Sequence, residues 1–214
     1  IITRMRIRFA ALAAAVAVAT AFPADSIAYV ASGPTWNLSQ VPYYVNTANM
    51  DLLRASSVQT AVRYGAEAWH LQTGAGFQFS FAGQSSQTTT TYDGTNLVVF
   101  RNASSGSAIA TTYWWSSSSR IIDADIVFWD GAFTFFAGTT GCSGGFYIED
   151  IAAHEFGHAL GLGHSATTAA TMYFSTSSCN LSNRSLHADD IAGVLALYPP
   201  PTPPPAPTGV RFTN

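Results

Sequence analysis

The chain has 214 residues, which suits one main domain once a targeting segment and a tail are set aside. Apolar residues make up 48% of it and charged residues only 10%, so it can bury a core; its formal net charge is -3. It contains no lysine and no basic stripe that could bind the phosphates of a nucleic acid. These properties exclude nucleic-acid binding and argue against a disordered chain.

The first 28 residues have the layout of a targeting segment. Basic residues around Met5 precede an apolar run over residues 9–22, which is too short to remain as a membrane-spanning helix in the mature protein. Four small residues near its end offer cleavage points: Ala19, Ala21, Ala24 and Ala28. We expect a signal peptide over approximately residues 1–28, export from the cell, and no stable membrane insertion afterwards. A retained N-terminal anchor is the alternative.

A strand and a helix are expected at the start of the body. Alternating apolar residues after a turn-prone Ser-Gly-Pro favour a strand within residues 36–46. Over residues 56–72 apolar side chains recur every three or four positions, which predicts an amphipathic helix. His70 on this helix has no histidine one turn away, so we interpret it as a surface or core-edge residue.

Short runs rich in aromatic and β-branched residues follow, separated by Ser, Thr and Gly. Such runs predict strands, and they fall at residues 77–81, 97–100, 109–115 and 121–129. Because a helix precedes these strands and further helices follow them, we expect a layered α+β domain and not a chain of βαβ units.

Two further helices and a tail complete the chain. Periodicity and acidic residues in the first turn predict a helix over 148–161 that stops at a glycine, and a second pattern predicts a helix over 187–198. Residues 199–207 are rich in proline and predict a polyproline II spacer. Residues 208–214 turn apolar again, as expected for the first strand of a further module such as a fibronectin type III-like domain.

The two cysteines, Cys142 and Cys179, predict a disulfide, because an even cysteine count in an exported protein usually means a bridge. The bridge would tie the segment before the helix at 148–161 to the loop after it. A role as zinc ligands is the alternative, and it is disfavoured because neither cysteine belongs to a close Cys or His pair.

The most informative stretch runs from His154 to His164 and has the sequence HEFGHALGLGH. Residues four apart face the same side of a helix, so His154 and His158 can bind one metal ion. Gly161 lets the chain leave the helix sharply, so that His164 can return to the same ion. Three nitrogen ligands and one open position are typical of a catalytic zinc site. The alternative, an amphipathic helix with surface histidines, does not explain why three of five histidines have this spacing.

Glu155 lies beside the expected ligands without being one of them. Zinc lowers the pKa of a bound water from about 16 toward about 7, and Glu155 can accept the proton as that water attacks a peptide carbonyl. The same carboxylate can then pass the proton to the leaving amine. The sequence therefore predicts a zinc-dependent peptidase with Glu155 as the general base.

With Met172 downstream, this stretch resembles the longer motif and the Met-turn of the metzincin clan of zinc peptidases. Within the clan it is most similar to the matrixins, the matrix metalloproteinase type, because Ser165 follows the third histidine. The resemblance covers most of residues 36–198, and it identifies residues 29–198 as a catalytic domain.

The resemblance implies a twisted, mixed β-sheet packed against helices, with the active-site helix at the floor of a substrate cleft and Met172 below the metal ligands. Residues 109–113, including Ile109 and Ala110, match the cleft-edge strand of the family, whose backbone would pair with an extended substrate. Tyr173 and Phe174 would line the specificity pocket, although Phe174 stands where matrixins usually have proline.

Two aspartates in the last helix, Asp189 and Asp190, would be structural and would hold the Met-turn or the mature N-terminus. Asp125 occupies the place of a histidine in the structural metal segment of the family, so we expect no second zinc. Together with Asp123 and Asp130 it offers hard oxygen ligands for calcium, with an ordinary solvated turn as the alternative.

The function expected from these features is that of a secreted, monomeric zinc endopeptidase that hydrolyses peptide bonds in extracellular proteins. No cysteine lies between the targeting segment and the domain, so we expect the bacterial type without a cysteine-switch propeptide. The alternatives are an accessory role beside an adhesion module that follows residue 207, a catalytically silent zinc-binding member, and an aminopeptidase. An intact Glu155 argues against the silent member, and the cleft-edge strand argues against the aminopeptidase.

Overall fold

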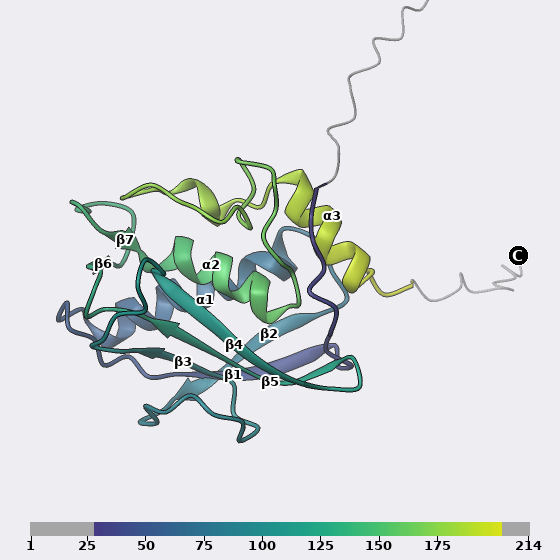
Figure 1. Ribbon diagram of the computed structural model, residues 1–214, viewed down its shortest axis with the longest axis horizontal. Helices are drawn as coiled ribbons and strands as arrows, with labels where there is room; N and C mark the ends of the chain where they lie inside the picture. The colour runs from purple at the N-terminus through teal and green to yellow at the C-terminus, as the bar shows by residue number, and fades with distance from the viewer. Residues whose placement is uncertain (1–27, 203–214) are drawn as a thin grey trace, which may run out of the picture.

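A five-stranded mixed sheet forms the centre of the molecule, for which a computed structural model describes residues 28–202 (Figure 1). Its strands are β1 (Gln40–Val45), β2 (Gln78–Gln84), β3 (Leu97–Phe100), β4 (Ala110–Ser117) and β5 (Arg120–Phe128). They lie in the order β2-β1-β3-β5-β4. The first four in this order run parallel, and β4 pairs antiparallel with β5 as an edge strand. The mixed α+β architecture predicted from the sequence is therefore confirmed.

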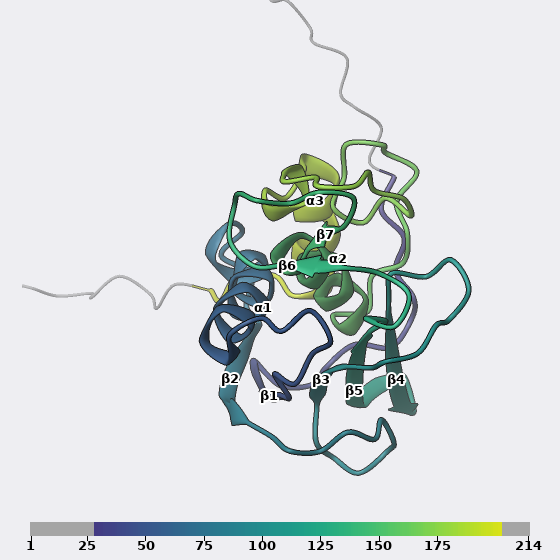
Figure 2. The same ribbon diagram turned by 90° about the vertical axis from the view of Figure 1, so that its left-hand side faces the viewer.

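Two long helices, α1 (Ala55–Leu71) and α2 (Ile148–Ala159), cover one face of the sheet (Figures 1 and 2). The apolar face of α1 is buried against α2 and the sheet, and Trp69 donates from Nε1 to the Ala153 carbonyl at 2.8 Å. The two helices cross closely at Gly65, where a side-chain carbon would lie only 2.6 Å from Ala152 Cβ. This close crossing lets α1 pack directly against α2.

The helix α3 (Ala188–Leu197) completes the fold beside the end of α2, where the side chain of Tyr198 joins two parts of the chain. The Tyr198 hydroxyl donates to the Leu160 carbonyl at 2.7 Å and accepts from the Trp36 backbone N–H at 3.0 Å. Tyr198 therefore connects the chain at Trp36 to the C-terminal end of α2.

The opposite face of the sheet carries a smaller apolar cluster of Leu97, Val99, Val127 and Trp129. A loop over residues 85–96 crosses this side of the sheet (Figures 1 and 2), and two buried aspartates of β5 hold it there. The backbone N–H groups of Asp93 and Gly94 donate to Asp123, and those of Thr91 and Leu97 donate to Asp125.

The helices and strands predicted from periodicity are confirmed, with shifts of a few residues at their ends. The sequence did not indicate the two-residue strands β6 (Phe135–Phe136) and β7 (Phe146–Tyr147) or the short 3-10 helix η1 (Ser182–Arg184). Residues 1–27 of the expected signal peptide (1–28), residues 203–207 of the proline-rich spacer and the further module at 208–214 lie outside the described residues. Within residues 28–202 no helix is both long and apolar enough to cross a membrane.

Candidate metal centre

Three histidine side chains converge at the C-terminal half of α2. His154 and His158 point from the same side of the helix, and His164 arrives from the loop that begins at Gly161. Gly161 has a φ of +100°, a conformation that side-chain-bearing residues rarely adopt, so it lets the chain turn back toward the helix. The structure thus brings together the three residues that the sequence indicated as ligands.

Hydrogen bonds orient two of these imidazole rings. Nδ1 of His154 lies 2.7 Å from the Thr171 carbonyl, and Nδ1 of His158 lies 2.8 Å from the Leu162 carbonyl. Because a carbonyl can only accept, both Nδ1 atoms carry the proton. The lone pair is therefore on Nε2 in each ring, which is the state that a metal ligand requires.

The Nε2 atoms face one another at short range. His158 Nε2 lies 3.1 Å from His154 Nε2 and 3.2 Å from His164 Nε2. Nε2 of His154 and Nε2 of His158 carry no hydrogen, so the contact between them is not a hydrogen bond. Two lone pairs at this distance call for a cation between them. Four-coordinate zinc with bonds of 2.0 to 2.1 Å would hold its nitrogens about 3.3 Å apart. The three histidines therefore fit a zinc ion.

Burial also keeps the rings neutral. Desolvation lowers the pKa of His154 and of His158 to about 4, and it lowers the pKa of the more exposed His164 as well. In the described residues, this is the one group of three or more His, Cys, Asp or Glu side chains whose ligand atoms converge.

Glu155 lies next to the histidines with its side chain buried, and its carboxylate meets the edge strand. Thr112 of β4 donates from Oγ1 to Glu155 Oε2 at 2.6 Å. Desolvation raises the pKa of Glu155, while His158 and the hydroxyl of Thr112 act in the opposite direction. The result is a carboxyl group that is fixed in place by a single short hydrogen bond.

The turn that contains Met172 packs against α2 at Gly157, between His154 and His158. The Met172 side chain is buried against Gly157, where any side chain would collide with the Met172 sulfur. Asp190 accepts from the backbone N–H groups of Thr171 at 2.8 Å and Met172 at 3.0 Å. Asp190 thus holds the turn whose Thr171 carbonyl orients His154.

Asp189, the neighbour of Asp190, ties the start of the described chain to the same region. Its carboxylate accepts from the backbone N–H groups of Ala28 and Tyr29 and, at 2.6 Å, from the hydroxyl of Ser165. The two aspartates therefore have the structural positions that the sequence led us to expect.

A cleft of about 730 Å³ opens above the histidines. The four tentative pocket residues of the sequence analysis all line it: Ile109, Ala110, Tyr173 and Phe174. Phe174 is 65% exposed and packs on Tyr173, with 4.6 Å between ring centroids. The cleft is also lined by residues that the sequence did not single out, among them Thr112, Phe133, Phe146, Ile151 and Asn183.

Cys142 and Cys179 are joined by a disulfide that spans 37 residues of sequence.

The three aspartates considered for calcium do not form one site. Asp123 and Asp125 accept backbone hydrogen bonds from the loop over the sheet, whereas Asp130 accepts from Met50 N–H. Within residues 28–202 no acidic group with three converging carboxylates exists.

Comparison with known families supports what this geometry suggests. The model of the matrixin family of peptidases matches residues 35–199, which is more than half of the chain. The chain belongs to the matrixin family. Matrixins are zinc-dependent metalloendopeptidases, so the enzyme class predicted from the sequence is confirmed at the level of the family.

This matrixin is similar to animal and plant relatives over part of its length. It is 44% identical to human neutrophil collagenase over 70 residues, which are 33% of this chain and 15% of the relative. It is 51% identical to rat stromelysin-1 over 53 residues, or 24% of this chain and 11% of the relative. With metalloendoproteinase 1-MMP of Arabidopsis thaliana, identity is 49% over 53 residues, or 25% and 14% of the two chains. The matched part is thus a small fraction of each relative.

The residues of this matrixin that the sequence missed share one property. Thr112, Phe133, Phe146 and Asn183 lie on four separate segments and meet only in the folded cleft. No local spacing indicates such a group. Only the short aromatic runs around residues 133 and 146 gave a signal, and they are equally typical of core residues.

Proposed function

We propose that this matrixin is a secreted zinc endopeptidase in which His154, His158 and His164 hold the metal and Glu155 is the general base. The convergence of three histidine Nε2 atoms, two of them unprotonated, beside a buried carboxylate carries the proposal. Such an arrangement has no structural use without a cation, and its position in an open cleft makes it accessible to substrate.

When bound, a zinc ion supplies Lewis acidity that polarises the scissile carbonyl and makes a water acidic enough to deprotonate near neutral pH. Glu155 accepts the proton of the attacking water and delivers it to the leaving nitrogen, so one carboxylate serves both halves of the hydrolysis. Thr112 keeps one carboxylate oxygen occupied and leaves the other free for this transfer.

The edge strand supports an endopeptidase over an aminopeptidase. β4 pairs only with β5, and residues on it line the cleft, so its other edge can pair with the main chain of an extended peptide. Main-chain pairing needs no free amino terminus. The substrate class is therefore an extended or locally unfolded polypeptide segment.

Secretion is supported by two features of the chain. Residues 1–28 have the basic and apolar layout of a signal peptide, and Cys142 is paired with Cys179, as is usual for proteins that mature in an oxidising compartment.

Replacing Glu155 by glutamine tests the role of the base. Glu155→Gln keeps the size of the side chain and can still accept from Thr112, but it cannot take a proton. We expect kcat on an unfolded protein such as denatured casein to fall by about 100-fold or more, with the zinc content unchanged. The matched control is Glu67→Gln, which changes a surface glutamate paired with Arg63 at 3.0 Å on α1. Equal activity of Glu155→Gln and the unchanged chain would contradict the proposal.

Metal removal tests the three ligands. Dialysis against a chelator should abolish cleavage, and zinc added back should restore it with about one ion per chain. In His158→Ala, zinc should bind far more weakly, because one of three protein ligands is missing. The half-buried His70 on α1, which is not one of the three converging histidines, provides the control, since His70→Ala should keep one zinc and full activity. Cleavage that survives complete removal of the metal would rule out the zinc mechanism.

A further inference from the structure

One side of the cleft consists of a segment with almost no regular structure. Residues 173–181 connect the Met172 turn to η1, and residues 173–183 contribute five cleft-lining side chains: Tyr173, Phe174, Ser175, Thr176 and Asn183. We call residues 174–183 the cleft wall. Apart from the first two residues of η1, the wall has no helix or strand, so contacts with other elements must hold it in place.

The cleft wall is attached at its middle to the segment before α2. The disulfide joins Cys179 to Cys142, and the Cys179 backbone N–H donates to the Gly145 carbonyl at 2.8 Å. Within the wall, Asn180 donates from its side-chain amide to Thr176 Oγ1 at 3.0 Å and to Asn183 Oδ1 at 3.1 Å.

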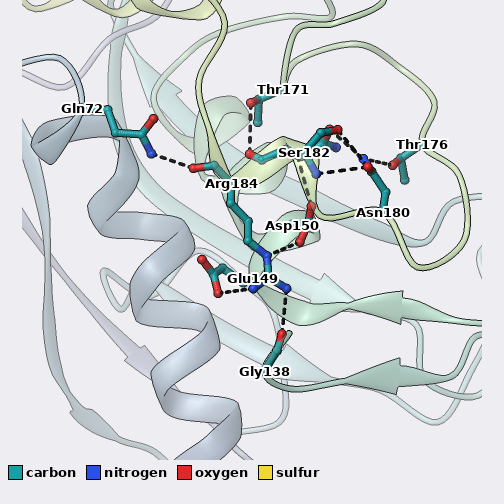
Figure 3. Close-up of polar contacts among 10 residues, drawn as sticks. Gln72, Gly138, Glu149, Asp150, Thr171, Thr176, Asn180, Ser182 and Arg184 are labelled. Atoms are coloured by element: carbon teal, nitrogen blue, oxygen red, sulfur yellow. Dashed lines mark hydrogen bonds and ion pairs between the residues drawn. The ribbon is translucent and has the colours of Figure 1, made fainter. Parts of the chain in front are cut away.

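Arg184 attaches the end of the cleft wall, as Figure 3 shows. Its guanidinium donates from Nε to Asp150 at 2.6 Å and from Nη2 to the Gly138 carbonyl at 2.8 Å, and Nη1 lies 2.9 Å from Glu149. The group also lies over the ring of Tyr147, 5.0 Å from its centroid. The planar fork of arginine suits this geometry, because it reaches three acceptors in different directions at once.

Two further hydrogen bonds hold Asn183, the wall residue next to Arg184. Asp150 Oδ1 accepts from the Asn183 backbone N–H at 3.1 Å, and the Asn183 carbonyl accepts from Thr171 Oγ1 at 3.1 Å. On the other side, Gln72 at the end of α1 donates to the Arg184 carbonyl at 2.6 Å (Figure 3). Asn183, which lines the cleft, is therefore fixed by the partners of Arg184.

The location of these partners connects the wall to the metal centre. Glu149 and Asp150 belong to the first turn of α2, the helix that carries His154 and Glu155 one turn further on. Asp150 is almost fully buried, and Arg184 is its one cationic partner among the described residues. Arg184 itself does not line the cleft. It can influence substrate only through the wall.

We propose that Arg184 is a positioning residue for substrate recognition: by clamping the cleft wall to the first turn of α2, it sets the width of the cleft beside the histidines and hence the affinity for a large apolar side chain of the substrate. Phe133, Phe146 and Ile151 line the same cleft as the wall, and such an apolar lining suits a large apolar side chain. This inference rests on the proposed peptidase function.

The test measures KM and kcat separately. Two fluorogenic peptides that differ only in one residue beside the scissile bond, leucine in one and alanine in the other, are cleaved by the unchanged chain and by Arg184→Gln. We expect Arg184→Gln to raise KM for the leucine peptide about tenfold, because a displaced wall no longer encloses the side chain. The KM for the alanine peptide, both kcat values and the zinc content should stay within about twofold, because the reacting groups are untouched.

Matched variants separate the clamp from general damage. Arg63→Gln removes an arginine that pairs with Glu67 on α1, away from the cleft, and should change neither KM. Asn180→Ala loosens the wall from within and leaves no buried charge unpaired, so it replaces Arg184→Gln if that variant does not fold. It should raise KM for the leucine peptide in the same direction by about threefold.

An unchanged ratio of the two KM values in both Arg184→Gln and Asn180→Ala would overturn the proposal. A fall in kcat by the same factor for both peptides would also overturn it, since that would show damage to the metal centre. These outcomes are distinct from a failure of the proposed function, in which the unchanged, zinc-loaded chain would cleave neither peptide.

Discussion

At the scale of single residues, the centre depends on a few hydrogen bonds that fix direction and protonation. Thr171 and Leu162 carbonyls set the tautomers of His154 and His158, and Thr112 holds the carboxylate of Glu155. Thr112 belongs to β4, the strand on which we propose that substrate pairs. The proposed base is thus aligned by the same strand that would align the peptide.

Thr112→Val tests this alignment. The valine has the same shape without the hydroxyl, so the Glu155 carboxylate loses its hydrogen bond and samples other rotamers. Hydrogen bonds to charged groups contribute about 1.5 to 3 kcal/mol, and we expect kcat to fall at least about tenfold while KM changes little. Thr112→Ser restores the hydroxyl and should recover most of kcat. If Thr112→Val and Thr112→Ser had the same kcat, the hydroxyl would have no part in catalysis.

The sequence indicated the proposed metal ligands but not this hydrogen bond, for a physical reason. His154, His158 and His164 lie within one helix and its exit turn, so their spacing alone predicts that they meet. Thr112 and Glu155 are 43 residues apart and meet because β4 lies beside α2. The same holds for Arg184 and Asp150, which are 34 residues apart.

At the scale of elements, the crossing of α2 with the Met172 turn has no spare room. A side-chain carbon on Gly157 would collide with the Met172 sulfur and lie 2.6 Å from the ring of Trp69. The glycine in the middle of the histidine motif therefore serves packing: it lets α2 rest directly on the turn that orients His154.

Gly157→Ala should be destabilising although alanine is the better helix former. Overpacking of this kind typically costs about 1 to 3 kcal/mol, more than the gain of about 1 kcal/mol in helix propensity. Urea unfolding should show a lower midpoint. Gly163→Ala is the control and should lower the midpoint less. Its added carbon would lie 3.1 Å from a methyl group of Val30, which can move. A larger loss in Gly163→Ala than in Gly157→Ala would contradict this account of the crossing.

The elements themselves were largely predictable. The helices α1, α2 and α3 follow from a hydrophobic period of 3.6 and β1 from alternation, whereas β2 to β5 follow from short runs of aromatic and β-branched residues. β6 and β7 were missed because two residues cannot display a period. The cleft wall was missed as a structural unit because its order comes from the disulfide and from Arg184, not from its own residues.

At the scale of the whole molecule, buried aspartates make stability depend on pH. Asp125 is fully buried, and desolvation raises its pKa to about 7 from the model-peptide value of 3.8. Between these pH values the folded chain binds more protons than the unfolded chain at this site. This aspartate therefore stabilises the fold at low pH, and its contribution is lost as the pH rises through about 7.

Asp125→Asn removes the titrating group. Relative to the unchanged chain, the free energy of unfolding of Asp125→Asn should improve by about 2 to 3 kcal/mol between pH 5 and pH 8, because each pH unit below the folded pKa contributes about 1.4 kcal/mol. The comparison by urea unfolding at both pH values cancels the contributions of the other titrating groups. A constant difference between the two proteins at pH 5 and pH 8 would show that Asp125 does not titrate in this range.

The disulfide encloses the proposed metal ligands and base within one covalent ring. Between Cys142 and Cys179 lie α2, the three histidines, Glu155 and the Met172 turn. This interval includes an exposed turn at residues 166–169, where a peptidase at high concentration can cut its neighbours. A cut there separates Met172 from the histidines along the backbone, yet both pieces remain linked through sulfur. Damage at this turn thus yields a nicked but undivided molecule, which runs as one band on a gel until a reductant is added.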